Sequence, residues 1–221
     1  MRGRRACIRR LQGVPELGLF PLPLVLVPTE RIPLHIFEPR YRELIGECVE
    51  ADGEFGLVFA PGDGAVHEIG TRARVAAVVE TLDDGRMNIV VEGGDRFRLL
   101  ELTRGRSYQT GLVEEVVDED EPPDDADVER ALEVFRLLAE AADSDVDLPD
   151  PESPDLVWEI AARVDFGTDP KQEILASTSP AQRVRRLIEL LEVSLEAVRV
   201  DQALRERAGR NGKVSPLDGL D

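Results

Sequence analysis

The feature of this sequence that most constrains its fold is a change of hydrophobic period near the middle of the chain. Up to about residue 117, short apolar runs alternate with glycine and proline turns, which is typical of β-strands. From about residue 128 onward, apolar residues recur every three or four positions, as in amphipathic helices. We therefore expect a β-rich domain followed by a helical domain, and 221 residues suffice for both.

The first part of the chain predicts a small, partly closed β-barrel with one inserted helix. Strand candidates lie at residues 17–22, 24–28, 55–60, 73–82, 87–91, 97–102 and 108–117. Residues 83–85, Asp-Asp-Gly, predict a hairpin turn, and the glycine pair 93–94 predicts a bend between two strands. The helix is expected to begin at Pro39 and end at Gly53. Its apolar stripe consists of Tyr41, Leu44, Ile45, Cys48 and Val49.

The second part predicts a helical bundle. A first helix is expected at residues 128–142, and three pairs of a capping residue followed by proline predict further helix starts. These pairs begin at Ser153, Asp169 and Ser179, and Gln172 and Gln182 stand where an amide can reach back to the cap. The stripe of the last helix alternates by four and three over only about two heptads. This favours a bundle core over a coiled coil.

These patterns divide the chain into five segments. We expect a disordered basic tail at 1–14, a barrel domain at 15–119, an acidic linker at 120–127, a helical bundle at 128–208 and a disordered tail at 209–221. The acidic segment is interpreted as a solvated linker, with an acidic docking strip as the alternative.

The charge of the chain limits its partners. The formal net charge is −18, and the positive charge comes almost entirely from arginine. Such a field repels phosphate backbones, so we do not expect nucleic acid as a partner. Prolines interrupt the most apolar run, and no secretion signal follows the basic start. We therefore expect no membrane segment and a cytoplasmic location.

A search for catalytic chemistry finds no complete set of residues. The only Gly-Lys pair, at 212–213, is not part of a phosphate-binding loop. His35 stands in an apolar context and His67 follows a turn, so neither suggests a base. Neither lysine occupies a position typical of a buried Ser-Lys dyad, and Cys48 reads as a core residue. We therefore expect no catalytic, cofactor-binding or metal-binding residues.

Several motifs in one order resemble the N-terminal domain of the Lon protease family. Residues 32–42 read IPLHIFEPRYR, which is similar to the family's proline-bounded strand and helix entry. Further matches lie at residues 68–75, 84–86, 91–93, 96–102 and 171–175. The resemblance runs from about residue 17 to residue 198.

The resemblance implies an α+β fold, in which a PUA-like barrel precedes a helical bundle. It also implies that the barrel and the bundle together recognise polypeptides. Lon proteases continue into an ATPase module and a Ser-Lys peptidase domain, and neither signature is found here. The expected function is therefore a non-catalytic module that binds polypeptides or partner proteins, with its oligomeric state left open. The competing hypotheses are RNA binding, by analogy with other PUA-like barrels, and hydrolysis by an unrecognised acid pair or metal.

Four apolar residues near the expected barrel–helix junction are candidates for contact with polypeptide: Leu34, Ile36, Phe37 and Phe97. Burying two or three such side chains contributes roughly 1.5–3 kcal/mol each. A structural role is expected for Glu38 and Arg40, in which one of them pairs across the barrel. The partners considered are Arg72, Glu92 and Arg96.

Overall fold

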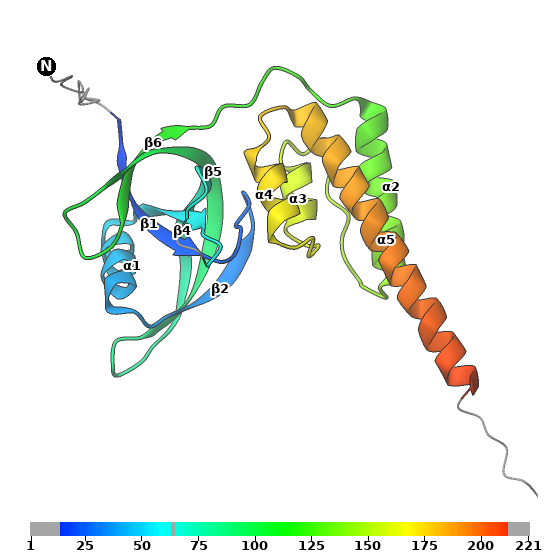
Figure 1. Ribbon diagram of the computed structural model, residues 1–221, viewed down its shortest axis with the longest axis horizontal. Helices are drawn as coiled ribbons and strands as arrows, with labels where there is room; N and C mark the ends of the chain where they lie inside the picture. Colours follow the sequence, from blue (N-terminus) through cyan, green and yellow to red (C-terminus); the bar gives the residue numbers. More distant parts are fainter. Residues whose placement is uncertain (1–13, 63–64, 212–221) are drawn as a thin grey trace, which may run out of the picture. The chain divides into compact units, whose positions relative to one another are not determined.

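The computed structural model describes residues 14–62 and 65–211, which form two compact units divided between Val117 and Asp118 (Figure 1). The first unit holds six strands and one helix, and the second holds four helices, counted over the described residues. The mixed α+β class expected from the sequence is confirmed. Each unit has its own buried apolar core.

The six strands of the first unit form one sheet. In chain order they are β1 (Glu16–Leu22), β2 (Arg31–Ile36), β3 (Glu54–Phe59), β4 (Ile69–Thr81), β5 (Met87–Thr103) and β6 (Thr110–Glu115). The order in the sheet is β2-β5-β4-β3-β1-β6, and β5 also pairs with β6. All pairs are antiparallel except β1 with β3.

The additional pairing closes a ring of five strands, from β5 through β4, β3, β1 and β6 back to β5. The ring is not a clean barrel, because β2 lies outside it and the β4–β5 ladder shifts register three times. Bulges of this kind bend a strand and increase its twist. The bend lets the long β5 pair with β4 over most of its length and with β6 near its end.

Two expectations about strands are wrong. The run at 24–28 is not a strand, although Val25, Leu26 and Val27 are buried, because two of its backbone groups bond to side chains instead. The Leu26 carbonyl accepts a hydrogen bond from Thr71 Oγ1 (2.5 Å), and the Val27 amide donates to Glu30 (3.0 Å). The glycines at 93–94 do not separate two strands either, since β5 runs through them.

The hairpin between β4 and β5 forms as expected. Gly85 has a φ of 81°, which costs a residue without a Cβ little, and the Leu82 amide donates to the Arg86 carbonyl (2.8 Å). Local turn stereochemistry was therefore sufficient to predict this connection.

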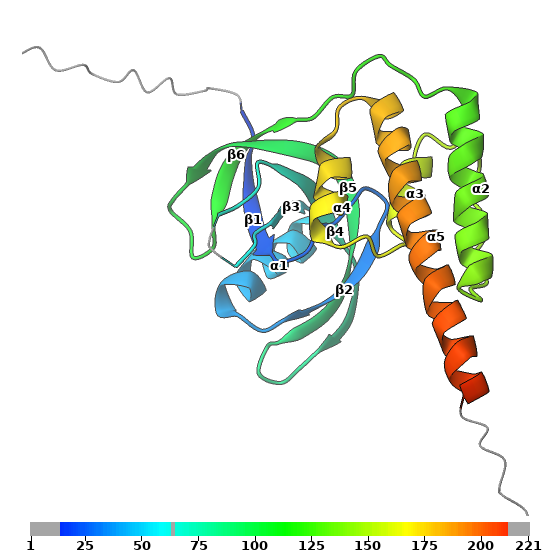
Figure 2. The ribbon, with the colours of Figure 1, turned by 45° about the vertical axis from the view of Figure 1, so that its right-hand side comes forward.

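One helix, α1 (Pro39–Ala51), packs its apolar stripe onto the strands (Figure 2). Tyr41, Leu44, Ile45 and Cys48 are buried as expected, whereas Val49 at the edge of the stripe is exposed. The helix ends one turn after Cys48, where Asp52 adopts a left-handed conformation and the Gly53 amide bonds to the Cys48 carbonyl.

The second unit contains α2 (Asp125–Ala141), α3 (Leu156–Ala161), α4 (Thr168–Ala176) and α5 (Pro180–Asn211). α5 contacts the other three helices and packs most extensively against α2. α2 and α5 run side by side in the same direction (Figures 1 and 2). Three polar contacts fix this alignment: Asp127 with Arg185 (2.9 Å), Arg130 with Glu192 (2.7 Å) and the Ala141 carbonyl with Gln202 (2.5 Å).

Of the three proline pairs, only the one at Ser179 marks the cap of a helix as expected. Ser179 caps α5 as expected, since its Oγ accepts a hydrogen bond from the Gln182 amide (3.1 Å). Ser153 instead closes a turn with the Asp155 amide (3.2 Å), and α3 begins later, at Leu156. α4 begins at Thr168, before the expected cap at Asp169, because Gly167 takes the capping position with a φ of 79°.

Candidate functional site

An apolar pocket of about 150 Å³ lies in the first unit where β2 leads into α1. Its walls come from β1, β2, α1 and the two residues that connect β2 to α1. The lining residues are Phe20, Leu22, Leu34, His35, Ile36, Phe37, Glu38 and Tyr41. Three of the four residues that the sequence suggested for polypeptide contact are therefore brought together here.

These three residues differ in how much surface they offer. Phe37 is 59% exposed, Leu34 is half-buried against the core, and Ile36 is buried. Phe20 and Tyr41 form the buried base of the pocket, with ring centroids 4.1 Å apart. The pocket thus combines a fixed aromatic base with one exposed aromatic ring at its rim.

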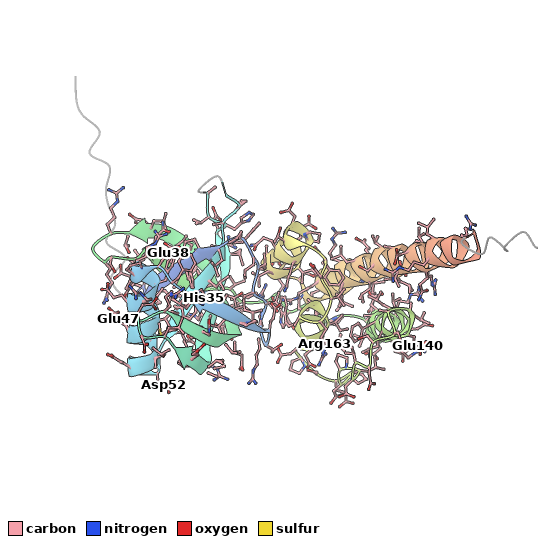
Figure 3. The ribbon with its side chains drawn as sticks, turned by 90° about the horizontal axis from the view of Figure 1, so that it is seen from below. His35, Glu38, Glu47, Asp52, Glu140 and Arg163 are labelled. Carbon is pink, nitrogen blue, oxygen red and sulfur yellow. The ribbon has the colours of Figure 1, made fainter. Side chains whose placement is uncertain are left out.

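Polar groups surround the rim without entering the apolar base. His35 stacks on Phe37, with ring centroids 6.1 Å apart, and its Nδ1 lies 2.7 Å from the Asn88 side-chain oxygen. Asn88 in turn donates to Glu80 (2.8 Å). This chain of contacts holds the imidazole in place beside Phe37, and His35 and Glu38 are both labelled in Figure 3.

The expected ion pair across the barrel is wrong for Glu38 and Arg40. These two residues pair with each other (2.8 Å), and the Arg40 guanidinium also lies over the Tyr41 ring, 4.5 Å from its centroid. Glu38 and Arg40 are two positions apart at the start of α1, so their side chains meet without reaching across the sheet. Of the proposed partners, Glu92 pairs with Arg31 and Arg74.

The two other proposed partners and the fourth candidate lie elsewhere. Arg72 faces Glu54 (3.7 Å), and the Arg96 carbonyl accepts a hydrogen bond from the Val116 amide (3.2 Å). Phe97 is fully buried in a second core cluster with residues of β1, β3 and β6. The sequence could not separate Phe97 from Phe37, since both stand in similar apolar contexts.

Two titratable groups of α1 have raised pKa values because they are buried. Burial raises the pKa of the Tyr41 phenol, although the Arg40 charge opposes this shift. Burial also raises the pKa of the Cys48 thiol to about 11, and the Glu47 carboxylate adds to the effect. A protonated thiol is a poor nucleophile at neutral pH.

Two kinds of feature are absent from the described residues. No group of three or more His, Cys, Asp or Glu residues has the arrangement of a metal site. No helix in this part of the chain combines the length and the apolar character needed to cross a bilayer.

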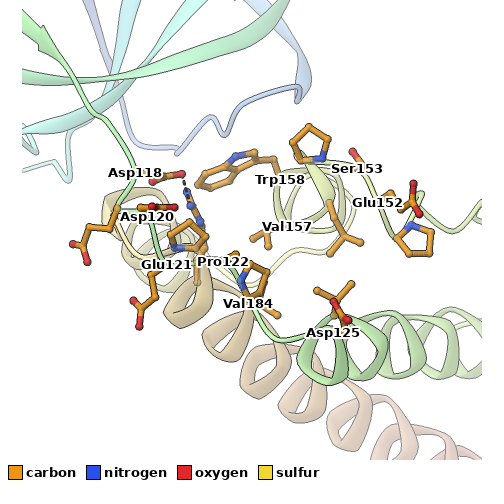
Figure 4. Close-up of a pocket in the computed structure, with 18 residues that line it drawn as sticks. Asp118, Asp120, Glu121, Pro122, Asp125, Glu152, Ser153, Val157, Trp158 and Val184 are labelled. Atoms are coloured by element: carbon orange, nitrogen blue, oxygen red, sulfur yellow. Dashed lines mark hydrogen bonds and ion pairs between the residues drawn. The ribbon is translucent and has the colours of Figure 1, made fainter.

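A larger pocket of about 450 Å³ lies in the second unit and has the opposite character (Figure 4). Six carboxylates line it: Asp118, Glu119, Asp120, Glu121, Asp125 and Glu152. Five prolines and the apolar residues Val128, Leu156, Val157, Trp158 and Val184 form its walls, and Arg183 is its one basic residue among those described. We call it the acidic pocket.

Part of this pocket is built by the expected linker at 120–127 and by the two residues before it. Asp118 pairs with the buried Arg183 (2.5 Å), and Glu119 accepts a hydrogen bond from Thr178 (2.6 Å). Glu121 accepts a hydrogen bond from Ser179. The segment is therefore attached to the α4–α5 connection, which acidity along the sequence alone did not reveal.

Comparison with known protein families gives one match over most of the chain. The family described as ATP-dependent protease La (LON) substrate-binding domain matches residues 16–193. Among curated relatives, Lon protease of Anaeromyxobacter dehalogenans is 28% identical over 197 residues, and Lon protease of Paraburkholderia phytofirmans is 26% identical over 213 residues. These alignments cover 81% and 88% of this chain but only 23% and 26% of the relatives. The chain thus spans about a quarter of their length.

Solved structures give the same result. A Lon N-terminal domain protein from Xanthomonas campestris aligns with a TM-score of 0.59 and 26% identity, over 80% of this chain and 98% of that chain. The N-terminal domain of a Mycobacterium avium complex Lon protease aligns with a TM-score of 0.50 and 19% identity, over 83% and 98% of the two chains. The second likeness concerns the fold alone.

Proposed function

Because this chain belongs to the family of Lon substrate-binding domains, as its motifs indicated, we propose that it binds polypeptides without hydrolysing them. The observation that carries this proposal is the match of residues 16–193 to a substrate-binding domain. The similarity lies outside the ATPase and peptidase parts of the relatives, so catalysis has no support from it.

The apolar pocket supplies a physical reason for polypeptide binding. Phe37 is 59% exposed and stands beside the half-buried Leu34 at the pocket, so the two side chains present apolar surface that a bound polypeptide can cover. Inserting an apolar side chain beside Phe37 and Leu34 removes apolar area from water on both molecules, at about 25 cal/mol per Å². The buried base formed by Phe20 and Tyr41 keeps the pocket open without reorganisation.

The finer description of the fold belongs to the same proposal. We assign the ring of five strands to a PUA-like barrel and the second unit to a helical bundle, supported by the strand pairings and by the packing of α5 on three helices. We also propose that the two compact units, divided between Val117 and Asp118, act as the two functional domains that the sequence suggested at 15–119 and 128–208. In this arrangement Leu34 and Phe37 supply the polypeptide contact, while the buried Ile36 and Phe97 support the barrel from within.

The test uses fluorescein-labelled, reduced and carboxymethylated lactalbumin as an unfolded polypeptide, titrated with the full chain and followed by fluorescence anisotropy. We expect saturable binding that Phe37→Ser weakens by roughly tenfold, which corresponds to about 1.4 kcal/mol of lost burial. Val79→Ser is the matched control, because Val79 is also exposed (67%) but lies away from the pocket.

Two results would contradict the proposal. One is the absence of saturable binding for lactalbumin and for a panel of other unfolded polypeptides. The other is equal weakening of binding by Phe37→Ser and Val79→Ser, which would show that the polypeptide does not bind at the apolar pocket. Incubation with labelled casein, with and without ATP, is expected to release no fragments, and turnover that a point mutation abolishes would establish an enzyme instead.

A further inference from the structure

One edge of the sheet in the first unit has no neighbouring strand. β2 pairs with β5 on one side, and among the described residues no strand pairs with its other side. Its residues alternate in exposure: Arg31, Pro33 and His35 are exposed, whereas the residues between them turn toward the core. A free strand edge presents unpaired N–H and C=O groups, to which a further strand can bond.

One hydrogen bond of the ladder shows which backbone groups of β2 point to this open edge. The Gly93 amide of β5 donates to the Glu30 carbonyl (2.9 Å), so the carbonyl before β2 points toward β5. Because successive residues of a strand turn their backbone groups to opposite sides, the even-numbered residues of β2 also face β5. The residues that face the open edge are Arg31, Pro33 and His35. They offer three carbonyl acceptors but only two amide donors, since proline has no N–H.

The apolar pocket adjoins the open edge. Three residues of β2 line the pocket together with Phe20 and Leu22 of β1, a strand with which β2 forms no ladder. Phe37, the exposed ring at the rim, follows β2 directly. The edge and the pocket therefore offer backbone hydrogen bonds and apolar contact to the same extended segment, a combination by which sheets recognise peptides.

From this arrangement we propose that β2 receives an extended segment of unfolded polypeptide as an additional strand. The backbone of the segment bonds to Arg31, Pro33 and His35, and one of its apolar side chains enters the apolar pocket. This inference rests on the proposed function and narrows its substrate class to segments that can extend and have free backbone N–H groups. An unfolded chain exposes such groups, whereas a folded protein has bonded nearly all of them. Recognition of the backbone thus selects the unfolded state and not a particular sequence.

A second copy of this chain fits the open edge less well. In the antiparallel register that pairs all three outward-facing residues, Pro33 of one copy lies opposite Pro33 of the other. The centre of such a ladder then lacks both of its hydrogen bonds. The net charge of −18 also opposes association between copies. Proline on an edge strand limits self-pairing in this way, while its carbonyl stays available to another chain.

The experiment compares two fluorescein-labelled eight-residue peptides in which valine and threonine alternate between terminal lysines. One is unmodified, and the other carries N-methyl groups on its six central residues. N-methylation keeps every side chain but removes the backbone N–H donors. In anisotropy titrations with the full chain, we expect the N-methylated peptide to bind at least about tenfold more weakly. Equal binding of the two peptides would overturn the proposal.

A matched pair of variants tests the same edge from the side of the protein. His35→Pro removes an outward-facing N–H, whereas His35→Ala loses the same contacts with Phe37 and Asn88 but keeps this donor. We expect His35→Pro to bind the unmodified peptide about fivefold more weakly than His35→Ala does. Circular dichroism verifies that both variants are folded, and equal binding by two folded variants would contradict the role of the edge.

Amide hydrogen exchange, followed by NMR on the unmodified protein, requires no variant. The Arg31 and His35 amides should exchange more slowly when the unmodified peptide is bound, because each then donates to it. The Ile32 and Leu34 amides face β5 and should exchange slowly in both states. Unchanged exchange at Arg31 and His35 under saturating peptide would overturn the proposal.

Failure of this proposal is distinguishable from failure of the proposed function. If lactalbumin binds and Phe37→Ser weakens it, but N-methylation of the peptide has no effect, the apolar pocket binds polypeptide without an added strand. If neither peptide nor lactalbumin binds, the proposed function itself is wrong. Sedimentation that shows a dimer, which His35→Pro dissociates, would assign the open edge to a second copy and overturn the inference.

Discussion

At Gly93 the backbone of β5 passes so close to the preceding loop that no larger residue fits. A Cβ at this position would lie 2.2 Å from the Val27 carbonyl oxygen. The same approach allows two backbone hydrogen bonds of 2.9 Å, from Thr29 to Gly93 and from Gly93 to Glu30. Glycine is therefore required here by a close contact between segments, and not by the bend that the sequence suggested.

Gly93→Ala should lower the free energy of unfolding by about 1–3 kcal/mol, because the added methyl group forces the loop and the strand apart. Gly46→Ala should do the reverse and stabilise by up to about 1 kcal/mol, since Gly46 lies inside α1 with open space around it. Urea unfolding followed by circular dichroism measures both. Equal destabilisation by the two substitutions would show that the close contact is not the cause.

Tyr108 gives the protein a specific sensitivity to high pH. Burial, with help from the Glu47 carboxylate that accepts its hydrogen bond (2.7 Å), raises the pKa of its phenol from 10.0 to about 12. Between these values the unfolded chain loses the phenolic proton while the folded chain keeps it. The contribution of the Tyr108 phenol to stability is therefore fully present below pH 10 and is lost as the pH rises toward 12.

Tyr108→Phe should remove this contribution. Urea midpoints measured from pH 9 to 12 should fall more steeply in the unmodified protein than in the variant. Parallel curves would mean that Tyr108 titrates with an ordinary pKa in the folded state.

At the scale of elements, the start of α5 organises the second unit. Ser179 accepts the cap bond from the Gln182 amide and donates to Glu121, so one side chain both begins the helix and attaches the 118–121 segment. The Ala181 amide also donates to the Glu121 carbonyl (3.2 Å). The cap was visible in the sequence, whereas the attachment depends on residues that are 58 positions apart.

Ser179→Ala should cost about 1–2 kcal/mol, because the helix loses its cap and Glu121 loses a donor. Ser194→Ala is a suitable control, since the Ser194 hydroxyl donates to the Leu190 carbonyl one turn back in α5 (2.8 Å) and caps no helix. This substitution should change stability by less than about 0.5 kcal/mol. Thermal or urea unfolding distinguishes the two. A larger loss at Ser194 than at Ser179 would refute the assigned role of the cap.

At the scale of the whole molecule, the net charge predicts weak binding to nucleic acid. The net charge of −18 and the carboxylates of the acidic pocket oppose phosphate groups over a range of about one Debye length. We expect no shift of a 20-nucleotide single-stranded RNA in an electrophoretic assay at physiological salt. Removing the residues before Val14 tests the arginine-rich start, and a shift that persists without them would favour the RNA-binding hypothesis.

The sequence by itself determined the features that depend on neighbouring residues. The proline at the start of α1, the cap at Ser179 and the turn at Gly85 are all local, and each was found where the pattern indicated. The change of period near residue 117 likewise marks where strands give way to helices. The motif at residues 32–42 was also sufficient to indicate the family.

Only the tertiary structure decided what depends on segments far apart in the chain. In the structure β5 continues through the glycines at 93–94, and a hydrogen-bonded loop takes the place of the strand expected at 24–28. Phe97 is buried, whereas Phe37 is exposed. The 118–121 segment is attached beside Arg183. In each case a backbone or side-chain group takes its partner from a distant segment, and the energy of that contact outweighs the local preference that the sequence displays.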